Sequence, residues 1–319
     1  MQNIKLTLAY DGSDFHGWQM QPGKPTIQGT LTDLVRKLTQ EEKIIVYGAG
    51  RTDAGVHALG QVAHFKTHSQ LTAAEFQRAC NALLPPSIRV LQAEEVGPDF
   101  HARWQAQAKT YAYRIFLGRL VLPFEWRYVF HYPYPLNKEA IAQAARLFEG
   151  EHDFASFSAS SGSEDDDSAE KFVRGRRKAE SASGARREPA TRRLVYRSEL
   201  IPAATAWPGG LPAAVFMLPG TSGSLAMGGQ AETPESRDEL VYVVRGRSFL
   251  RYMVRKLVGT LLEVGKGKLA PEDILPLFGL RDRSRSGPTV PACGLYLVSV
   301  EYPDPTASLD VSPWKALGR

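Results

Sequence analysis

Cysteine, metal-ligand spacings and long apolar runs are scarce in this chain of 319 residues. The two cysteines, Cys80 and Cys293, stand far apart, which argues against the disulfide framework of a small secreted domain. The histidines form no metal-ligand spacing with either cysteine. No apolar run approaches the ~20 residues of a membrane span, and residues 1–6 alternate like a strand instead of forming an apolar targeting core. We therefore expect a cytoplasmic protein that uses no metal and enters no membrane.

Length and charge set only broad limits. The chain is long enough for one large or two medium domains with a buried core. Its net charge of +5 and isoelectric point near 9.1 permit a polyanionic partner. A basic metabolic enzyme would have the same composition, so charge alone does not assign a function.

A glycine-rich turn over residues 48–60 is the most informative segment. Apolar runs at residues 44–47 and 62–65 flank it, and we interpret both as buried strands. Four glycines in the turn permit backbone angles and close approaches that side chains would block. Within it, Asp53 follows Arg51 by two residues. The turn therefore presents a single carboxylate to a ligand.

The residues of this turn allow two other interpretations. Its glycine spacing matches a phosphate-binding loop, but Val56 and His57 stand where that loop requires Lys and Ser or Thr. Asp53 could instead cap backbone amides, as aspartate often does in turns. The turn by itself leaves this second interpretation open.

Periodicity and capping residues predict the other elements. Thr26 is expected to cap a helix over residues 27–38, and Asn137 a helix that Gly150 stops. Another helix is expected to begin at Thr72 and end before residue 83. Strands are predicted at residues 4–10, 109–116, 194–201 and 240–244, the last two as a hairpin. A further helix over residues 250–262 has an apolar face flanked by Arg251 and Arg255, which are four residues apart. Arginines at such a margin are commonly surface residues whose stems cover apolar atoms.

Two long segments have a different composition. Residues 159–189 are rich in Ser, Gly and both signs of charge, and residues 202–238 are rich in Pro and Gly. Such segments bury too little apolar surface to offset the entropy of ordering, so we expect disordered insertions at the periphery. The alternative is an added RNA contact through the basic cluster at residues 176–178.

Residues 48–65 closely resemble the catalytic loop of the tRNA pseudouridine synthase A (TruA) family. The resemblance implies that Asp53 is the nucleophile and that Arg51 enters the RNA to displace the target base. Residues 109–111 match the family's Lys-Thr-Tyr motif. This match implies that the ring of Tyr111 stacks on the target uracil, with its hydroxyl as a candidate base.

Two more segments carry the resemblance. The helix that begins near residue 249 is similar to the family's Phe-Leu-x-x-Met-Val-Arg helix, which implies that Arg255 lies beside Asp53. A guanidinium there suits an ion pair that keeps the carboxylate ionised. Tyr252 stands where family members commonly carry His, so that histidine's role does not transfer. Residues 292–298 also match, which implies that Leu295 forms an apolar wall of the uracil pocket.

The resemblance covers residues 3–302 apart from the two insertions. It implies an α+β fold of two α/β halves, with a mixed, mainly antiparallel sheet and flanking helices around a central basic cleft. The N-terminal half would span residues 1–105 and carry the catalytic loop. The C-terminal half would span residues 106–302, followed by a flexible tail over residues 303–319.

The implied activity is an isomerase that converts uridine to pseudouridine at positions 38, 39 and 40 of the tRNA anticodon stem-loop. The resemblance also implies a homodimer. Because the reaction involves no redox change and gains no group, no cofactor is expected. The sequence leaves open whether Asp53 attacks the ribose or the base. Two other functions stay open: a pseudouridine synthase with another RNA target, and a non-catalytic RNA-binding protein of the same fold.

Overall fold

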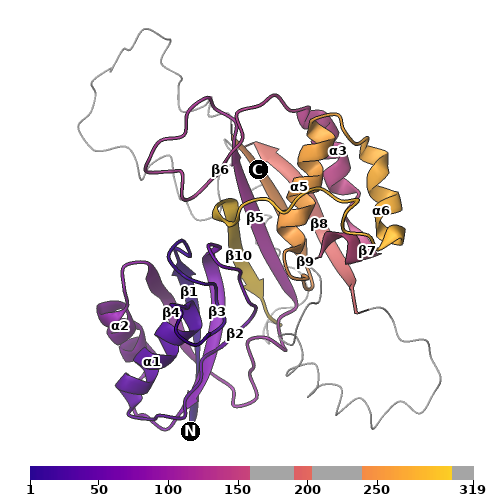
Figure 1. Cartoon of the computed structure of the whole chain (residues 1–319). Helices are drawn as coiled ribbons and strands as arrows, with labels where there is room; N and C mark the ends of the chain where they lie inside the picture. Colours follow the sequence, from indigo (N-terminus) through magenta and orange to yellow (C-terminus); the bar gives the residue numbers. More distant parts are fainter. Residues whose placement is uncertain (159–189, 203–238, 304–319) are drawn as a thin grey trace, which may run out of the picture.

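The computed structural model describes residues 1–158, 190–202 and 239–303. In this part of the chain, ten strands form one sheet, ordered β4-β1-β3-β10-β5-β9-β8-β7, with β2 attached to β3 and β6 to β5 (Figure 1). Most neighbouring strands are antiparallel, which confirms the predicted α+β class with a mixed, mainly antiparallel sheet. Apart from Pro202 and Pro303, the predicted insertions 159–189 and 202–238 and the tail 303–319 lie outside the described residues.

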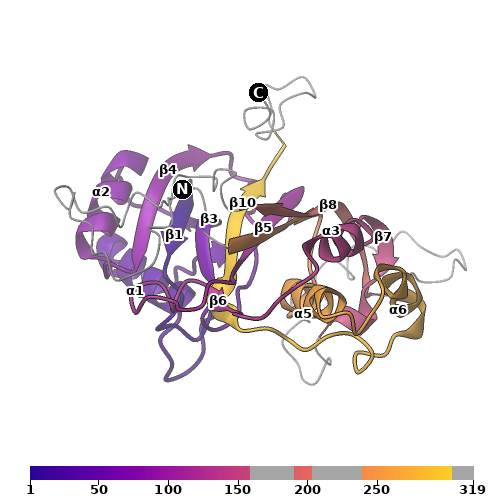
Figure 2. The ribbon, with the colours of Figure 1, turned by 90° about the horizontal axis from the view of Figure 1, so that it is seen from above.

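The N-terminal part of the sheet is an antiparallel unit covered by two helices. Its central strand β1 (Gln2–Tyr10) pairs with β3 (His57–Thr67) and β4 (Ile88–Val96). Alternate side chains of β1 are fully buried, as the predicted alternation requires. They share one hydrophobic cluster with the buried faces of α1 (Ile27–Thr39) and α2 (Ala73–Leu83), which lie with these strands in Figure 2.

The C-terminal part repeats this layering with more strands. Its antiparallel strands are β5 (Ala108–Phe116), β9 (Glu239–Gly246), β8 (Arg192–Pro202) and β7 (Gly150–Asp153), while β6 (Phe130–His131) runs parallel to β5. Its helices are α3 (Lys138–Arg146), α5 (Met253–Gly265) and α6 (Ile274–Leu280). The pairing of β8 with β9 confirms the predicted hairpin. No helix of the described residues is long and apolar enough to cross a membrane.

The last strand, β10 (Leu295–Glu301), joins the two parts into one sheet. It runs parallel to β3, with Tyr296 opposite His57, and antiparallel to β5, with Leu295 opposite Tyr113. A segment from the end of the described chain therefore occupies the centre of the sheet, between strands formed much earlier in the sequence (Figures 1 and 2).

Local signals located the starts of three helices correctly. The Thr26 hydroxyl accepts a hydrogen bond from the Gly29 amide, and Thr72 forms a capping box with Glu75. Asn137 likewise caps α3. The end of α3 differs from the prediction, because the helix stops at Arg146. Gly150, at a φ of +102°, begins the next strand instead of ending the helix.

Two other predicted boundaries were wrong for tertiary reasons. Residues 44–47 are mostly not a strand, since only β2 (Tyr47–Gly48) pairs with β3. The backbone of Val46 bonds instead to side chains of α1, the Gln28 amide and the Thr32 hydroxyl. The helix predicted from residue 250 begins later, at Met253. Arg251 therefore precedes α5 rather than sharing a helical face with Arg255.

The ends of the β8–β9 hairpin lead to a test. Because these strands pair as far as Pro202 and Leu240, the chain ends that flank residues 203–238 lie side by side. We expect a variant with a short Gly-Ser turn in place of residues 203–238 to keep the parent's thermal unfolding midpoint. The control also removes Glu239 to Val241, which truncates the ladder and should lower the midpoint. An equal loss in both variants would contradict the prediction.

Candidate active site

The loop that carries Asp53 is held in place by the segment before α1. The Trp18 amide donates to the Thr52 carbonyl at 3.0 Å, and the Gly55 amide donates to the Phe15 carbonyl at 3.3 Å. Gly17 adopts a φ of +87°, and a Cβ at that position would lie 2.5 Å from the Thr52 oxygen. Only glycine permits this approach, so the two backbones can lie against each other.

Buried polar side chains fix the same loop from the sheet. The Tyr10 and Thr52 hydroxyls lie 2.9 Å apart, and the Gln61 amide donates to the Gly50 carbonyl at 2.9 Å. Gln61 also reaches the Tyr10 hydroxyl, at 3.4 Å. Because these side chains are all buried, their hydrogen bonds are not exchanged for bonds to water. These hydrogen bonds fix the backbone of the loop and thereby the position of Asp53.

Asp53, on the loop before β3, contacts Arg255 on α5. An Arg255 terminal nitrogen lies 3.5 Å from an Asp53 carboxylate oxygen, and both side chains are mostly buried. The Arg255 Nε donates to the Val290 carbonyl at 2.7 Å, which fixes the direction of the guanidinium. The pairing matches the sequence expectation, although the contact is a single long one rather than a bidentate pair.

Burial dominates the electrostatics of this carboxylate. It raises the pKa of Asp53 above its usual range, while the charges of Arg255 and then Arg251 act in the opposite direction. From the sequence, the nearby guanidinium is expected to keep this carboxylate ionised, with a pKa below its usual range. The difference arises because desolvation of a carboxylate outweighs one long ion pair.

Tyr252 lies between the two arginines. The guanidinium carbons of Arg251 and Arg255 are each 5.0 Å from the centre of its ring. Its backbone has a φ of +61°, a conformation that is strained for a bulky residue. The ring thus contacts both cations.

Tyr111 is on β5, near enough to Asp53 for the charge of that carboxylate to act on its hydroxyl. Its side chain is buried, and its ring packs edge-on against Phe249 at 5.0 Å. Burial, followed by the Tyr10 and Asp53 groups, raises the pKa of Tyr111 far above its usual value. A hydroxyl that holds its proton this firmly is a poor general base, so the geometry favours the ring's role as a platform.

The remaining predicted site residues are Arg51 and Leu295. Arg51 is exposed on the same loop as Asp53. Leu295 is buried at the start of β10 and lies opposite Tyr113, while Tyr111 lies opposite Leu297. The structure thus brings Asp53, Arg255 and Tyr111 together. Leu295 lies two residues along β10 from Leu297, the residue that pairs with Tyr111.

Several residues of the site were not found from the sequence. Tyr10 and Gln61 support the loop, yet each looked like an ordinary member of a strand. Val290 contributes only a backbone carbonyl, which has no sequence signal. Lys109 was noted only as part of a motif, but its ammonium lies beside the Asp53 loop: a Cβ on Gly50 would be 2.9 Å from it.

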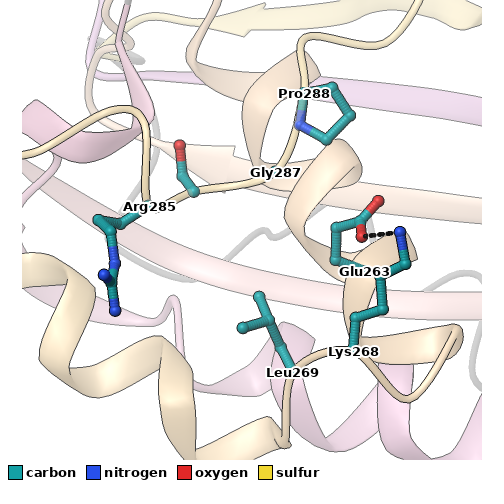
Figure 3. Close-up of a pocket in the computed structure, with 7 residues that line it drawn as sticks. Glu263, Lys268, Leu269, Arg285, Gly287 and Pro288 are labelled. Atoms are coloured by element: carbon teal, nitrogen blue, oxygen red, sulfur yellow. Dashed lines mark ion pairs between the residues drawn. The ribbon is translucent and has the colours of Figure 1, made fainter.

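A separate hollow lies at the end of α5. Figure 3 shows this space, of about 350 Å³, lined by Glu263, Lys268, Leu269, Arg285, Ser286, Gly287 and Pro288. Its carboxylate is already paired, with Lys266 at 2.7 Å and Lys268 at 3.4 Å. None of the predicted site residues lines it. Within the described ranges, no group of three His, Cys, Asp or Glu residues is arranged to hold a metal ion.

Comparison with known proteins gives a consistent match. The profile of the family described as tRNA pseudouridine synthase matches residues 7–105 and 144–303. The chain is 43% identical to tRNA pseudouridine synthase A of Solibacter usitatus over 302 residues, which covers 95% of this chain and 100% of that protein. It is 36% identical to the enzymes of the same name from Latilactobacillus sakei and Geobacillus kaustophilus, with at least 94% of each chain covered.

The raised pKa of Asp53 predicts how stability depends on pH. Above its folded-state pKa, the buried carboxylate destabilises the fold relative to the unfolded chain, and the penalty disappears below the unfolded value of about 3.9. We expect Asp53→Asn to raise the free energy of unfolding at pH 7, with a gain that vanishes below about pH 4. Chemical denaturation across pH measures this. The exposed Asp33→Asn on α1 is the control, and a loss of stability at pH 7 in Asp53→Asn would contradict the prediction.

Proposed function

The chain belongs to the tRNA pseudouridine synthase family and is an isomerase that converts tRNA uridine to pseudouridine, and we propose that it acts at positions 38, 39 and 40 of the anticodon stem-loop. One observation carries the catalytic assignment: Asp53 lies on a loop fixed by buried hydrogen bonds and contacts Arg255, which lies on α5 in the C-terminal part of the fold. A loop that only capped its own amides would not need this cation.

The reaction rearranges one nucleoside without adding or removing atoms. The bond between uracil N1 and ribose C1′ breaks, the base turns, and a bond forms between C5 and C1′. The proton on C5 is lost and N1 gains one, so the product is an isomer of the substrate. The balance requires neither an oxidant nor a transferred group, and we propose that the enzyme uses no cofactor.

Asp53 supplies the charge that this rearrangement needs. Its carboxylate either attacks the ribose or base covalently or stabilises positive charge on the ribose as the base leaves. Arg255 favours the ionised carboxylate against the burial that raises its pKa. Because the Val290 carbonyl also binds this guanidinium, Arg255 orients the carboxylate as well as stabilising its charge.

The remaining residues would hold and deliver the base. The ring of Tyr111 would stack on the extruded uracil, since every base offers a π-face to an aromatic platform. Leu295 would close the pocket with an apolar wall. Arg51, exposed on the catalytic loop, would enter the RNA and occupy the space that the target base leaves.

We place the enzyme in the cytoplasm and expect it to bind tRNA as a homodimer, in a basic cleft between its two halves. The proposed halves are residues 1–105 and 106–302, with the tail at residues 303–319. Their meeting at β10 supports this division, because that strand pairs with β3 from one half and with β5 from the other.

Removal of the Asp53 charge tests the catalytic assignment. Asp53→Asn is nearly isosteric, so we expect tRNA affinity to change by less than about 1 kcal/mol while turnover becomes undetectable. The measurement is tritium release from tRNA that contains 5-tritiated uridine, because C5 loses its hydrogen only when the base is rejoined there. Mapping of the modified positions in the product tests the anticodon assignment. Asp33→Asn is the control, and activity of Asp53→Asn within tenfold of the parent would reject the nucleophile.

Substitutions of Arg255 and of Arg51 should impair different steps of the reaction. Arg255→Ala should lower the single-turnover rate more than tRNA binding, because it leaves the Asp53 carboxylate without its partner. Arg51→Ala should impair base extrusion, so a mismatched target uridine, which is already partly unpaired, should restore part of its rate. If the mismatch rescues both variants equally, the proposed division of roles is wrong.

A further inference from the structure

A group of basic side chains beside the catalytic loop has no acidic partner. Lys66 and Arg103 are exposed, and Lys109 is partly buried. Within the described residues, none of the three forms an ion pair. The charged neighbours of this group are basic as well: Arg103 lies near Lys109 and His101, and Lys66 lies near His64 and His101.

Aromatic rings lie within the same group. The rings of His101 and Trp104 stack with centroids 3.7 Å apart and planes 12° from parallel. Tyr47 stacks on His64 at 5.5 Å, and His64 in turn contacts His101 at 4.5 Å. Trp104 is 51% exposed and Tyr47 is 46% exposed, so each of these two rings is accessible over about half of its surface.

The imidazoles in the stack act as rings rather than as cations. Burial lowers the pKa of both His64 and His101 to about 4, with help from the neighbouring bases. At neutral pH both are therefore uncharged. Positive charge in this region comes from Lys66, Arg103 and Lys109.

This group adjoins the catalytic loop at two points. Tyr47 directly precedes the loop, and the Lys109 ammonium lies beside Gly50 within it. Gly50 is only three residues from Asp53, a span of at most about 11 Å. Lys109 is also two residues from Tyr111 on β5, so both side chains leave the same face of that strand.

An ammonium that is partly buried without a counter-ion destabilises a fold, which points to a ligand that supplies the anion. Burial and then the charge of Arg103 lower the pKa of Lys109 to about 8, which records the same penalty. A ligand that suits both features carries negative charge and a flat ring. Among biological ligands, a nucleotide has both.

We propose that Lys109 and Arg103 bind a phosphate of the RNA, and that the accessible part of the Trp104 ring stacks on an unpaired base next to the target uridine. This subsite rests on the proposed function, since the RNA is the substrate of the Asp53 site. It would hold the strand beside the extruded uridine and so fix the register of the loop over Asp53.

Stability and binding should respond in opposite directions at Lys109. Lys109→Met keeps the stem's bulk and removes the uncompensated charge, so we expect its thermal unfolding midpoint to rise. The same variant should bind unmodified tRNA more weakly, and the slope of log affinity against log salt should become shallower by roughly 0.7 to 0.9. Lys37→Met, an exposed position on α1, is the control and should change neither quantity.

Stacking is tested separately at Trp104. We expect Trp104→Ala to weaken tRNA binding by about 5- to 100-fold with an unchanged salt slope, and Trp104→Phe to retain most of the affinity. Anticodon stem-loop RNAs with one abasic nucleotide at each position near the target then locate the base. At the stacked position, the abasic change and Trp104→Ala should each weaken binding, and together they should weaken it no further.

The outcomes separate this subsite from the catalytic proposal. If Lys109→Met and Trp104→Ala bind tRNA with the parent's affinity and salt slope while the parent forms pseudouridine, the subsite is wrong and the catalytic assignment stands. A lower unfolding midpoint in Lys109→Met would also overturn it, because the lysine would then be structural. If Asp53→Asn retains turnover while the binding changes occur, the catalytic assignment fails and the subsite stands.

Discussion

The approach of Asp53 to Arg255 is the constraint on which the rest of the site depends. The two residues are 202 positions apart: Asp53 lies on the loop before β3, and Arg255 lies on α5 in the C-terminal part of the fold. Neither element can drift without separating the charges, so each is held by other contacts. Trp18, Tyr10 and Gln61 hold the loop, and the Val290 carbonyl holds the guanidinium. Much of the buried polar structure around the loop thus serves the position of one carboxylate.

That position keeps the carboxylate in a partly dry environment. Burial raises the pKa of Asp53, whereas its nearest cations oppose the shift over a long contact. A tighter ion pair would hold the charge more firmly and make it less available for reaction. The observed balance leaves an anion that is only weakly satisfied, which suits a group that must respond to charge developing on a substrate.

Features of this chain that depend on neighbouring residues were predictable from sequence. The three helix caps follow from side chains within three residues of the amides they bind. Residues 44–47 were misassigned because α1 binds the backbone of Val46, a contact that no local pattern reveals. Likewise, only the family resemblance paired Asp53 with Arg255. The unpartnered Lys109 became visible only when the fold placed it beside the loop.

The central place of β10 has a consequence for biosynthesis. Chains emerge from the ribosome N-terminus first, at about 5–20 residues per second, and domains fold as they appear. Strands β3 and β5 are made long before residues 295–301, which must fit between them. The nascent chain therefore carries two unpaired strand edges, on β3 and β5, until residues 295–301 have been made. Such edges can pair with other chains, and a chain that stops before residue 295 lacks the strand that joins the two parts of the sheet.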